Sequence, residues 1–237
     1  MNYASTVLLA LLAAAPIAAF AQEASPPAGT GTPTGFMDVR AIRPVAGDAK
    51  AGAGKVTICS ACHGHSGMAV VPELGNLAGQ PATYLYIQLK AFKDGYRSDP
   101  VMSGQAARLS DEDMRDIAAY YASFAPASHG GTDTSSPGAR LYREGDPGRG
   151  IPPCQGCHGP DARGPRPFVA DVEGKPQPPW FTYPYLHGQS ANFVTKALGD
   201  FRAGVRAGTS NARIMQGVAQ GLSDADIQAL SAYLPHL

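Results

Sequence analysis

Two short stretches of this 237-residue chain share one pattern, Cys59-Ser-Ala-Cys62-His63-Gly64 and Cys154-Gln-Gly-Cys157-His158-Gly159. Each stretch is followed, in the same order, by L-x-G-Q, F-x-x-G-x-R, a methionine and L-S-D-x-D. Corresponding residues are 95 positions apart at the Cys motif, 109 apart from Leu77 to Arg97, and 113 apart from Met102 onward. The pattern therefore predicts two tandem copies of one small domain.

The C-x-x-C-H spacing has a chemical explanation. Two thiols one helical turn apart can add to the vinyl groups of a haem, and the adjacent imidazole then reaches the iron. A zinc site would need 91 residues between Cys62 and Cys154, and a thioredoxin-like dithiol would need a strand–helix unit. Two plain disulfides would leave both histidines unexplained. We therefore predict two covalently bound c-type haems, with thioether bonds from Cys59, Cys62, Cys154 and Cys157 and with His63 and His158 as iron ligands.

A methionine is the predicted second axial ligand in each half. Met102 and Met215 occupy matching places in the repeat, each before the final helix, and a thioether on a loop there suits a haem iron. The simpler alternative is a methionine in the core. His187, which replaces Ala78 of the first copy, is a rival ligand to Met215.

The apolar spacing predicts an all-α, loop-rich fold with little or no sheet. Helices are expected over 82–94 and 191–203, where apolar side chains recur on one face. Ser110 and Ser223, each followed three residues later by Asp, predict the start of a last helix in each half. Short helices are expected before each Cys motif.

The N-terminal residues predict an exported protein. An apolar run is broken by Pro16, and Ala19-Phe20-Ala21 fits a signal-peptidase site, so we expect cleavage after Ala21 and a periplasmic location with no remaining membrane span. The alternative is a retained anchor, although the run is short for a span. The predicted organisation is signal peptide 1–21, flexible leader 22–47, first domain 48–125, linker 126–137 and second domain 138–237.

Composition and charge exclude some partners. The chain has 19 Lys and Arg against 19 Asp and Glu, whereas binding to nucleic acid by phosphate neutralisation requires a marked basic excess. We therefore expect no nucleic-acid partner. The 28 Gly and 21 Pro indicate many loops, while 44% hydrophobic residues suffice for a core.

The order of these motifs resembles the small class I cytochromes c, and the tandem form is similar to the cytochrome c4 family of diheme electron carriers. The resemblance implies the same thioether and axial residues as above. It further implies an electron carrier, not an enzyme, between a respiratory donor complex or dehydrogenase and a terminal oxidase, with redox proteins as partners. Two alternatives stay open: a diheme enzyme of the peroxidase or thiosulfate-oxidising type, and a bound cytochrome subunit of a dehydrogenase or oxidase complex. The long leader and a Pro-rich insertion at 160–185 depart from the family pattern.

Overall fold

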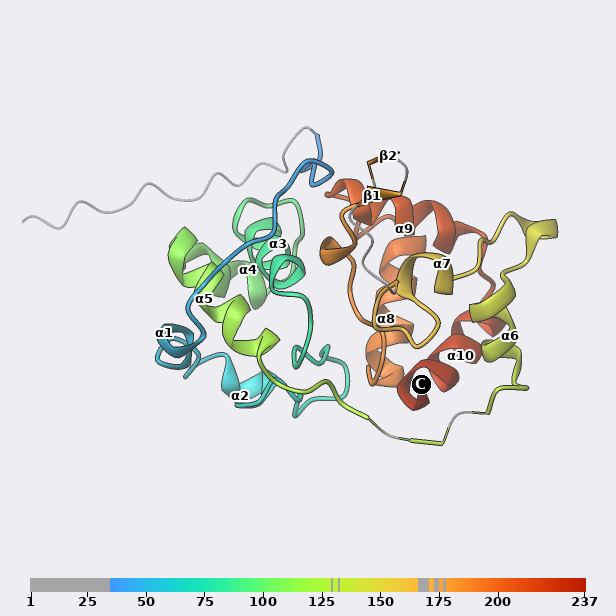
Figure 1. Ribbon diagram of the computed structural model, residues 1–237, viewed down its shortest axis with the longest axis horizontal. Coiled ribbons are helices and arrows are strands. Elements are labelled where there is room, and N and C mark those ends of the chain that lie inside the picture. Colours follow the sequence, from blue (N-terminus) through green and yellow to red (C-terminus); the bar gives the residue numbers. More distant parts are fainter. Residues whose placement is uncertain (1–34, 129, 132, 166–170, 173–174, 177) are drawn as a thin grey trace, which may run out of the picture. The chain divides into compact units, whose positions relative to one another are not determined.

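Ten α-helices, three 3-10 helices and one two-stranded ribbon make up the part of the chain that the structure describes (Figure 1). The structure is a computed structural model that describes residues 35–237 except 129, 132, 166–170, 173, 174 and 177. The elements are α1 (Ala49–Ala53), α2 (Ser60–His63), α3 (Ala82–Lys93), α4 (Met102–Ala107), α5 (Asp111–Ala122), α6 (Pro137–Glu144), η1 (Pro147–Arg149), α7 (Gln155–His158), β1 (Asp171–Val172), β2 (Lys175–Pro176), η2 (Trp180–Thr182), α8 (Ala191–Arg202), α9 (Ser210–Gln220), α10 (Asp224–Tyr233) and η3 (Leu234–His236). The prediction of an all-α, loop-rich fold is confirmed.

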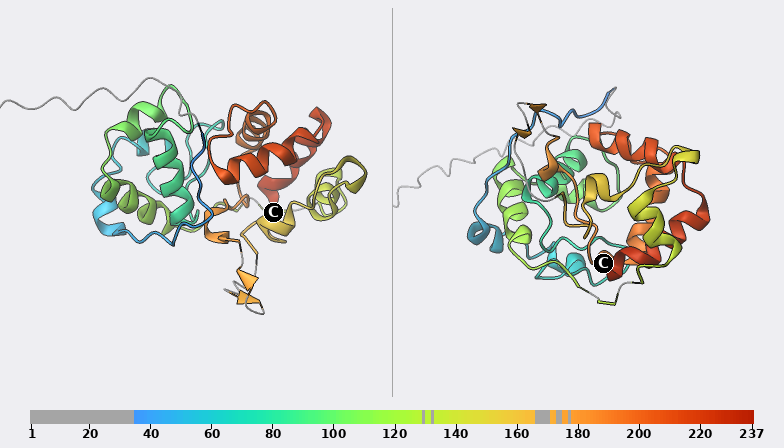
Figure 2. Two further views of the ribbon diagram at one scale, coloured as in Figure 1. Left: turned by 90° about the horizontal axis from the view of Figure 1, so that it is seen from above. Right: turned by 45° about the vertical axis from the view of Figure 1, so that its right-hand side comes forward.

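Each half is built around a crossing of its first and last helices. α1 packs on α5 and α6 packs on α10, and Figure 2 shows the second pair, yellow-green against red, from two further directions. A glycine lies at both crossings, because a Cβ at Gly52 would collide with the carbonyl of Asp116, and one at Gly138 would collide with that of Ala229. The two crossings are thus equivalent, and each half has its own cluster of buried apolar side chains.

Caps determine where the last helix of each half begins. The Ser110 hydroxyl accepts a hydrogen bond from Asp113 N at 3.0 Å, and the Asp113 carboxylate accepts one from Ser110 N at 2.9 Å. Ser223 and Asp226 make the same reciprocal pair in the second half. Both predicted helix starts are therefore confirmed, and each cap satisfies backbone donors that the helix itself leaves unpaired.

The F-x-x-G-x-R motif ends α3 and α8 in the same way. The glycine after each helix has a positive φ, 78° at Gly95 and 72° at Gly204, a conformation that favours glycine. This turn brings the guanidinium of each motif back over its own phenyl ring. The carbon of the guanidinium lies 4.5 Å from the ring centroid in both pairs, Arg97–Phe92 and Arg206–Phe201.

The two methionines lie on helices, so the prediction of a loop was wrong. Met102 is the first residue of α4, where the Asp99 carboxylate accepts from Met102 N at 2.9 Å and caps the turn. Met215 lies inside α9, which Thr209 caps. The four extra residues before Met215 in the repeat correspond to an additional helical turn at the start of α9.

The prediction that residues 22–47 form a flexible leader is wrong for the part of this segment that the structure describes. Residues 1–34, which include the predicted signal peptide, lie outside the described residues. Met37 N donates to Gly208 O at 2.8 Å, and Val39 is only 1% exposed. The reason is apolar spacing, since the side chains that pack on the first core include Met37, Val39, Ile42 and Val45. No helix in the described residues has the length and apolar character needed to cross a membrane.

Candidate haem-binding sites

One continuous cavity contains seven of the eight predicted site residues. It is lined by side chains of both halves and is mainly apolar. The lining includes Cys59, His63 and Met102 from the first half and Cys154, Cys157, His158 and Met215 from the second. Cys62 is exposed and does not line the cavity, although it is one helical turn from Cys59.

His158 has the surroundings of a metal-ligating imidazole. The side chain is 4% exposed, and its Nδ1 lies 3.0 Å from the carbonyl oxygen of Pro184. Nε2 is buried and has no hydrogen-bond partner among the described residues. Burial lowers the pKa of His158, which keeps the ring neutral, and a neutral imidazole whose other nitrogen is held by a carbonyl is the form that binds a metal.

His63 is less enclosed but similar. Burial lowers the pKa of His63, and the nearby backbone of Gly75 acts in the opposite direction. Its Nδ1 is buried without a hydrogen-bond partner in the described structure. Buried polar atoms are rarely left unpaired in native proteins, so both rings have coordination capacity that the chain itself does not use.

Like the histidines, the cysteines of the second half are more buried than those of the first half. Burial raises the pKa of Cys154 to about 11 and also raises the pKa values of Cys157 and Cys59. A thiol with a raised pKa is a poor thiolate nucleophile or metal ligand at neutral pH. Cys59, Cys154 and Cys157 nevertheless line the apolar cavity, where a bond to a haem vinyl group would form.

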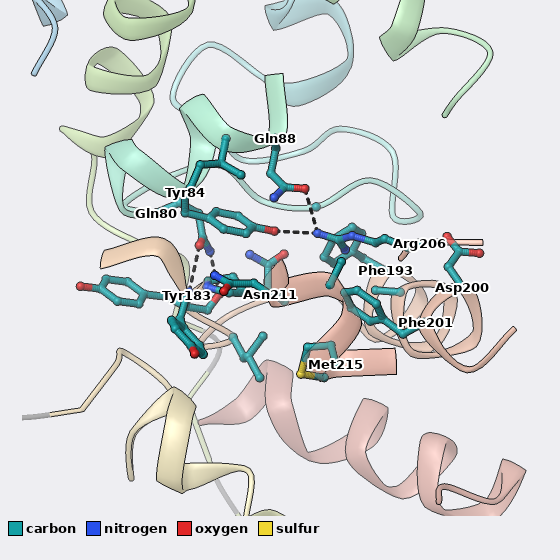
Figure 3. Close-up of a pocket in the computed structure, with 18 of the residues that line it drawn as sticks. Gln80, Tyr84, Gln88, Tyr183, Phe193, Asp200, Phe201, Arg206, Asn211 and Met215 are labelled. Atoms are coloured by element: carbon teal, nitrogen blue, oxygen red, sulfur yellow. Dashed lines mark hydrogen bonds between the residues drawn. The ribbon is translucent and has the colours of Figure 1, made fainter. Parts of the chain in front are cut away.

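His187 does not take the position of an axial ligand in this structure. It does not line the cavity, whereas Met215 does, and the sulfur of Met215 is visible at the cavity in Figure 3. The Nε2 of His187 instead lies 2.5 Å from the Arg163 guanidinium. These contacts favour Met215 over its rival.

Two arginines meet at the same cavity, a feature that the sequence did not assign to the site. Arg97 Nη1 donates to Gln88 Oε1 at 2.6 Å. Arg206 Nη2 donates to the same oxygen at 3.0 Å and to Tyr84 OH at 3.1 Å (Figure 3). Burial, together with the charge of Arg206, lowers the pKa of Arg97 to about 9. Two cations that share one neutral acceptor favour an anionic group beside them.

The residues present therefore fit two haems. Buried imidazole nitrogens without partners, methionine sulfurs and an apolar cavity suit the iron and the porphyrin, and the guanidinium pair suits carboxylate groups. The repeat of F-x-x-G-x-R, with its arginine at a matching place in both halves, was the sequence signal for this pair.

The Pro-rich insertion covers the second site. Tyr183 lies edge-to-face against the His158 ring, with centroids 6.4 Å apart, and also packs on Trp180 at 5.3 Å. η2 contacts α3 of the first half, and Thr182 is 2% exposed. Trp180 is half-buried, so this part of the insertion is shared between the cover of the second site and the surface.

Comparisons with known proteins agree with this description. The cytochrome c family model matches residues 49–124 and 135–237. Cytochrome c4 of Pseudomonas aeruginosa is 41% identical over 194 residues, which is 81% of this chain and 90% of that protein. The crystal structure of reduced recombinant cytochrome c4 from Pseudomonas stutzeri matches with a TM-score of 0.69 at 39% identity, covering 81% of this chain and all of that one.

A further relative carries a different description. The "thiosulfate dehydrogenase electron acceptor" of Thiomonas intermedia is 36% identical over 182 residues, which is 74% of this chain and 76% of that protein. These matches imply a diheme electron-transfer cytochrome with two covalently bound c-type haems, one for each C-x-x-C-H motif. The chain belongs to the cytochrome c4 family of diheme cytochromes c.

Proposed function

We propose that this protein is a periplasmic electron carrier that takes electrons from a respiratory donor complex or dehydrogenase and passes them to a terminal oxidase. Haem iron supplies reversible one-electron chemistry when bound. The chain contributes the attachment of each group by two cysteines, its axial ligation and its enclosure in an apolar cavity. Cys59 and Cys62 would hold one haem, and Cys154 and Cys157 the other.

The pairing of a histidine with a methionine in each half carries this proposal. His63 and Met102, and likewise His158 and Met215, line the same cavity. If both residues of a pair bind iron, no position is left for a substrate. A six-coordinate iron favours a carrier over an enzyme, since catalysis at haem needs an open or labile position.

The guanidinium pair would bind the haem propionates. Arg97 and Arg206 approach the same cavity from repeat-related positions and share Gln88 as their neutral acceptor. Carboxylates placed there would form charge-assisted hydrogen bonds with both arginines. This would return the pKa of Arg97 toward the ordinary arginine value and balance the charge of both guanidinium groups.

Carbon monoxide binding to the reduced protein tests carrier against enzyme. A reductive titration should consume two electrons per chain, and the fully reduced spectrum should not change under carbon monoxide, because both distal positions are filled. Rapid binding of carbon monoxide to one or both irons would instead favour the diheme enzyme of the peroxidase or thiosulfate-oxidising type. The variant Met215→Gly, with the distal sulfur removed, is the positive control for binding.

Export is the second part of the proposal. The apolar run, Pro16 and the Ala19-Phe20-Ala21 site support cleavage after Ala21. N-terminal sequencing of the protein recovered from a periplasmic extract should begin at Gln22. A mature chain that begins at Met1 and sediments with membranes would point to a retained anchor.

A second candidate function is that of an electron acceptor for a thiosulfate-oxidising enzyme. The thiosulfate dehydrogenase electron acceptor of Thiomonas intermedia, to which this chain is 36% identical, supports it. Such a role keeps the same two haems and the same ligands and differs only in the donor. Copurification with, or reduction by, a thiosulfate dehydrogenase would distinguish this donor from a respiratory complex.

A further inference from the structure

The L-x-G-Q motif joins the two halves through its glutamines. Gln80 Nε2 donates to Tyr185 O at 2.7 Å, and Tyr185 N donates to Gln80 Oε1 at 2.9 Å. Gln189 Nε2 donates to Asn76 O at 2.8 Å, and Asn76 N donates to Gln189 Oε1 at 2.9 Å. In each pair the side-chain amide of one half therefore matches the backbone N–H and C=O of a single residue in the other half.

The two pairs are the same interaction with the halves exchanged. Gln80 and Gln189 are 109 positions apart, and so are Asn76 and Tyr185, which is the repeat offset in this part of the chain. The contact between the halves thus has the reciprocal form of a two-fold interface between identical subunits. The same residue of the motif therefore makes an equivalent contact from each half to the other.

Burial makes these amides costly to separate. Gln80 and Gln189 are each 3% exposed and Asn76 is 9% exposed. Both polar ends of each glutamine amide are used across the contact, and Asn76 Nδ2 adds a bond to Gly188 O at 2.8 Å. Removal of one partner would leave buried donors and acceptors unpaired, and each unpaired group lowers the stability by its full desolvation free energy.

We propose that Gln80 and Gln189 form a reciprocal amide clamp that holds the two haem-binding halves in one relative position and so positions the haems for electron exchange within the chain. Both glutamines are positioning residues. The inference rests on the proposed attachment of one haem to each half. The exchange moves one electron, so that one iron is oxidised as the other is reduced, and it needs no proton or further reactant.

Hydrogen exchange of the intact, fully reduced protein is the first test, and it requires no variant. If the halves separate as units, the amides of Asn76 and Tyr185 become exposed in the same opening event. Their protection factors should then agree within about tenfold and exceed those of exposed loop amides. Protection factors that differ by more than this, or values typical of exposed loops, would overturn the clamp.

A variant in one pair should loosen the other pair. Gln80→Met keeps a side chain of similar length but removes the amide, so exchange at Asn76 should accelerate about tenfold or more although Gln189 is untouched. Intramolecular electron exchange after a flash that reduces one haem should slow as well. The exposed Gln228 on α10 supplies the matched control, Gln228→Met, which should change neither quantity. Unchanged exchange at Asn76 in Gln80→Met would contradict the proposal.

A pH profile of Gln189→Glu separates positioning from a general loss of stability. A protonated carboxyl has one donor and one acceptor and restores both bonds to Asn76, whereas the carboxylate cannot donate. Electron exchange within this variant should approach the wild-type rate at acidic pH and fall as the pH rises. A flat profile would overturn the role of the amide. The haem count and the methionine–iron band of the same samples report on the proposed function separately, because a defect there would alter the spectra and not only the exchange.

Discussion

The two halves of the molecule share their motifs but differ in how far each C-x-x-C-H site is open. In the first half Cys62 and Ile58 are exposed, the latter at 59%. In the second half His158 is 4% exposed, and Tyr183 from the insertion packs on its ring. The same set of predicted site residues is thus placed in a more open setting and in a more enclosed one.

In both halves a tyrosine hydroxyl reaches the backbone carbonyl that follows the C-x-x-C-H motif, but the tyrosine comes from a different helix in each half. Tyr142 of α6 donates to the carbonyl of Gly159, the residue after the second motif, at 2.6 Å. In the first half Tyr121 of α5 approaches the carbonyl of Gly64 at 3.5 Å. The hydroxyl therefore comes from the first helix in one half and from the last helix in the other. The difference teaches that the repeat preserves the neighbours of the haem motif, while the element that supplies them can change.

Loss of the attachment cysteines should have the largest effect. In Cys154→Ala/Cys157→Ala the haem count should fall from two to one, and the second half should lose cooperative folding, because the haem fills a cavity that the chain cannot close. Haem is counted by the pyridine haemochrome assay, and unfolding is followed by calorimetry. The matched variant Cys59→Ala/Cys62→Ala should also lose one haem but be less destabilised. Equal destabilisation of the two variants would remove the contrast between an open and an enclosed site.

Removal of the cover should bring the two sites closer in redox behaviour. Tyr183→Ala admits water beside His158, and water stabilises the more charged oxidised site, so the reduction potential of the second haem should fall. The expected shift is about 60 mV or less, roughly a tenfold change in a one-electron equilibrium. The first haem of the same protein is the internal control in a spectroscopic titration. A rise in potential, or an equal shift of both haems, would show that Tyr183 does not act through enclosure of the second site.

Much of the site could be predicted from local patterns. The cap residues Ser110 and Ser223 act within three positions of the chain, so sequence alone located the last helices. The Cys motifs and their histidines carry their chemistry in five consecutive residues. Met102 and Met215 were predicted as ligands from their matching places in the repeat, but the helices α4 and α9 that carry them were not predicted.

The rest depends on contacts between distant segments. The leader was expected to be flexible because its start is rich in Pro and Gly, yet Val39 is buried by side chains far along the chain. The meeting of Arg97 with Arg206 and the pairing of Gln80 with Gln189 also require the two halves to be placed together. Local spacing contains no information on such a contact, although the repeat identifies the residues that can make it.

An ion pair at the start of α5 should make the stability of the protein depend on acid. Lys55 pairs with Asp113 at 2.8 Å and holds the pKa of that carboxyl at about 2, below the ordinary 3.8. A lowered pKa contributes stability that is complete above pH 4 and is lost as the pH falls toward 2. Asp113→Asn should therefore be less stable than wild type at pH 7 and should match it near pH 2, as measured by denaturant unfolding. A difference between the two proteins that is constant across this range would refute the role of the ionised pair.

Salt should have the smallest effect. From Gln22 to Ala125 there are nine Lys or Arg and ten Asp or Glu, and from Pro126 to Leu237 there are ten and nine. Neither half has the net charge that long-range steering requires, so electron transfer to a redox partner should change by less than about tenfold between low and physiological ionic strength. Stopped-flow rates against salt concentration measure this. A fall of several decades would indicate a charged docking face.

Substitution of Met102 and Met215 tests most directly the proposal that each half binds one haem between a histidine and a methionine. The oxidised protein should show the weak red-end absorption band of methionine bound to ferric haem. The band should fall by half in Met102→Ala and by half in Met215→Ala, while the haem count stays at two in both variants. An unchanged band in Met215→Ala, with His187→Ala altering the spectrum instead, would contradict the account and make His187 the ligand of the second haem.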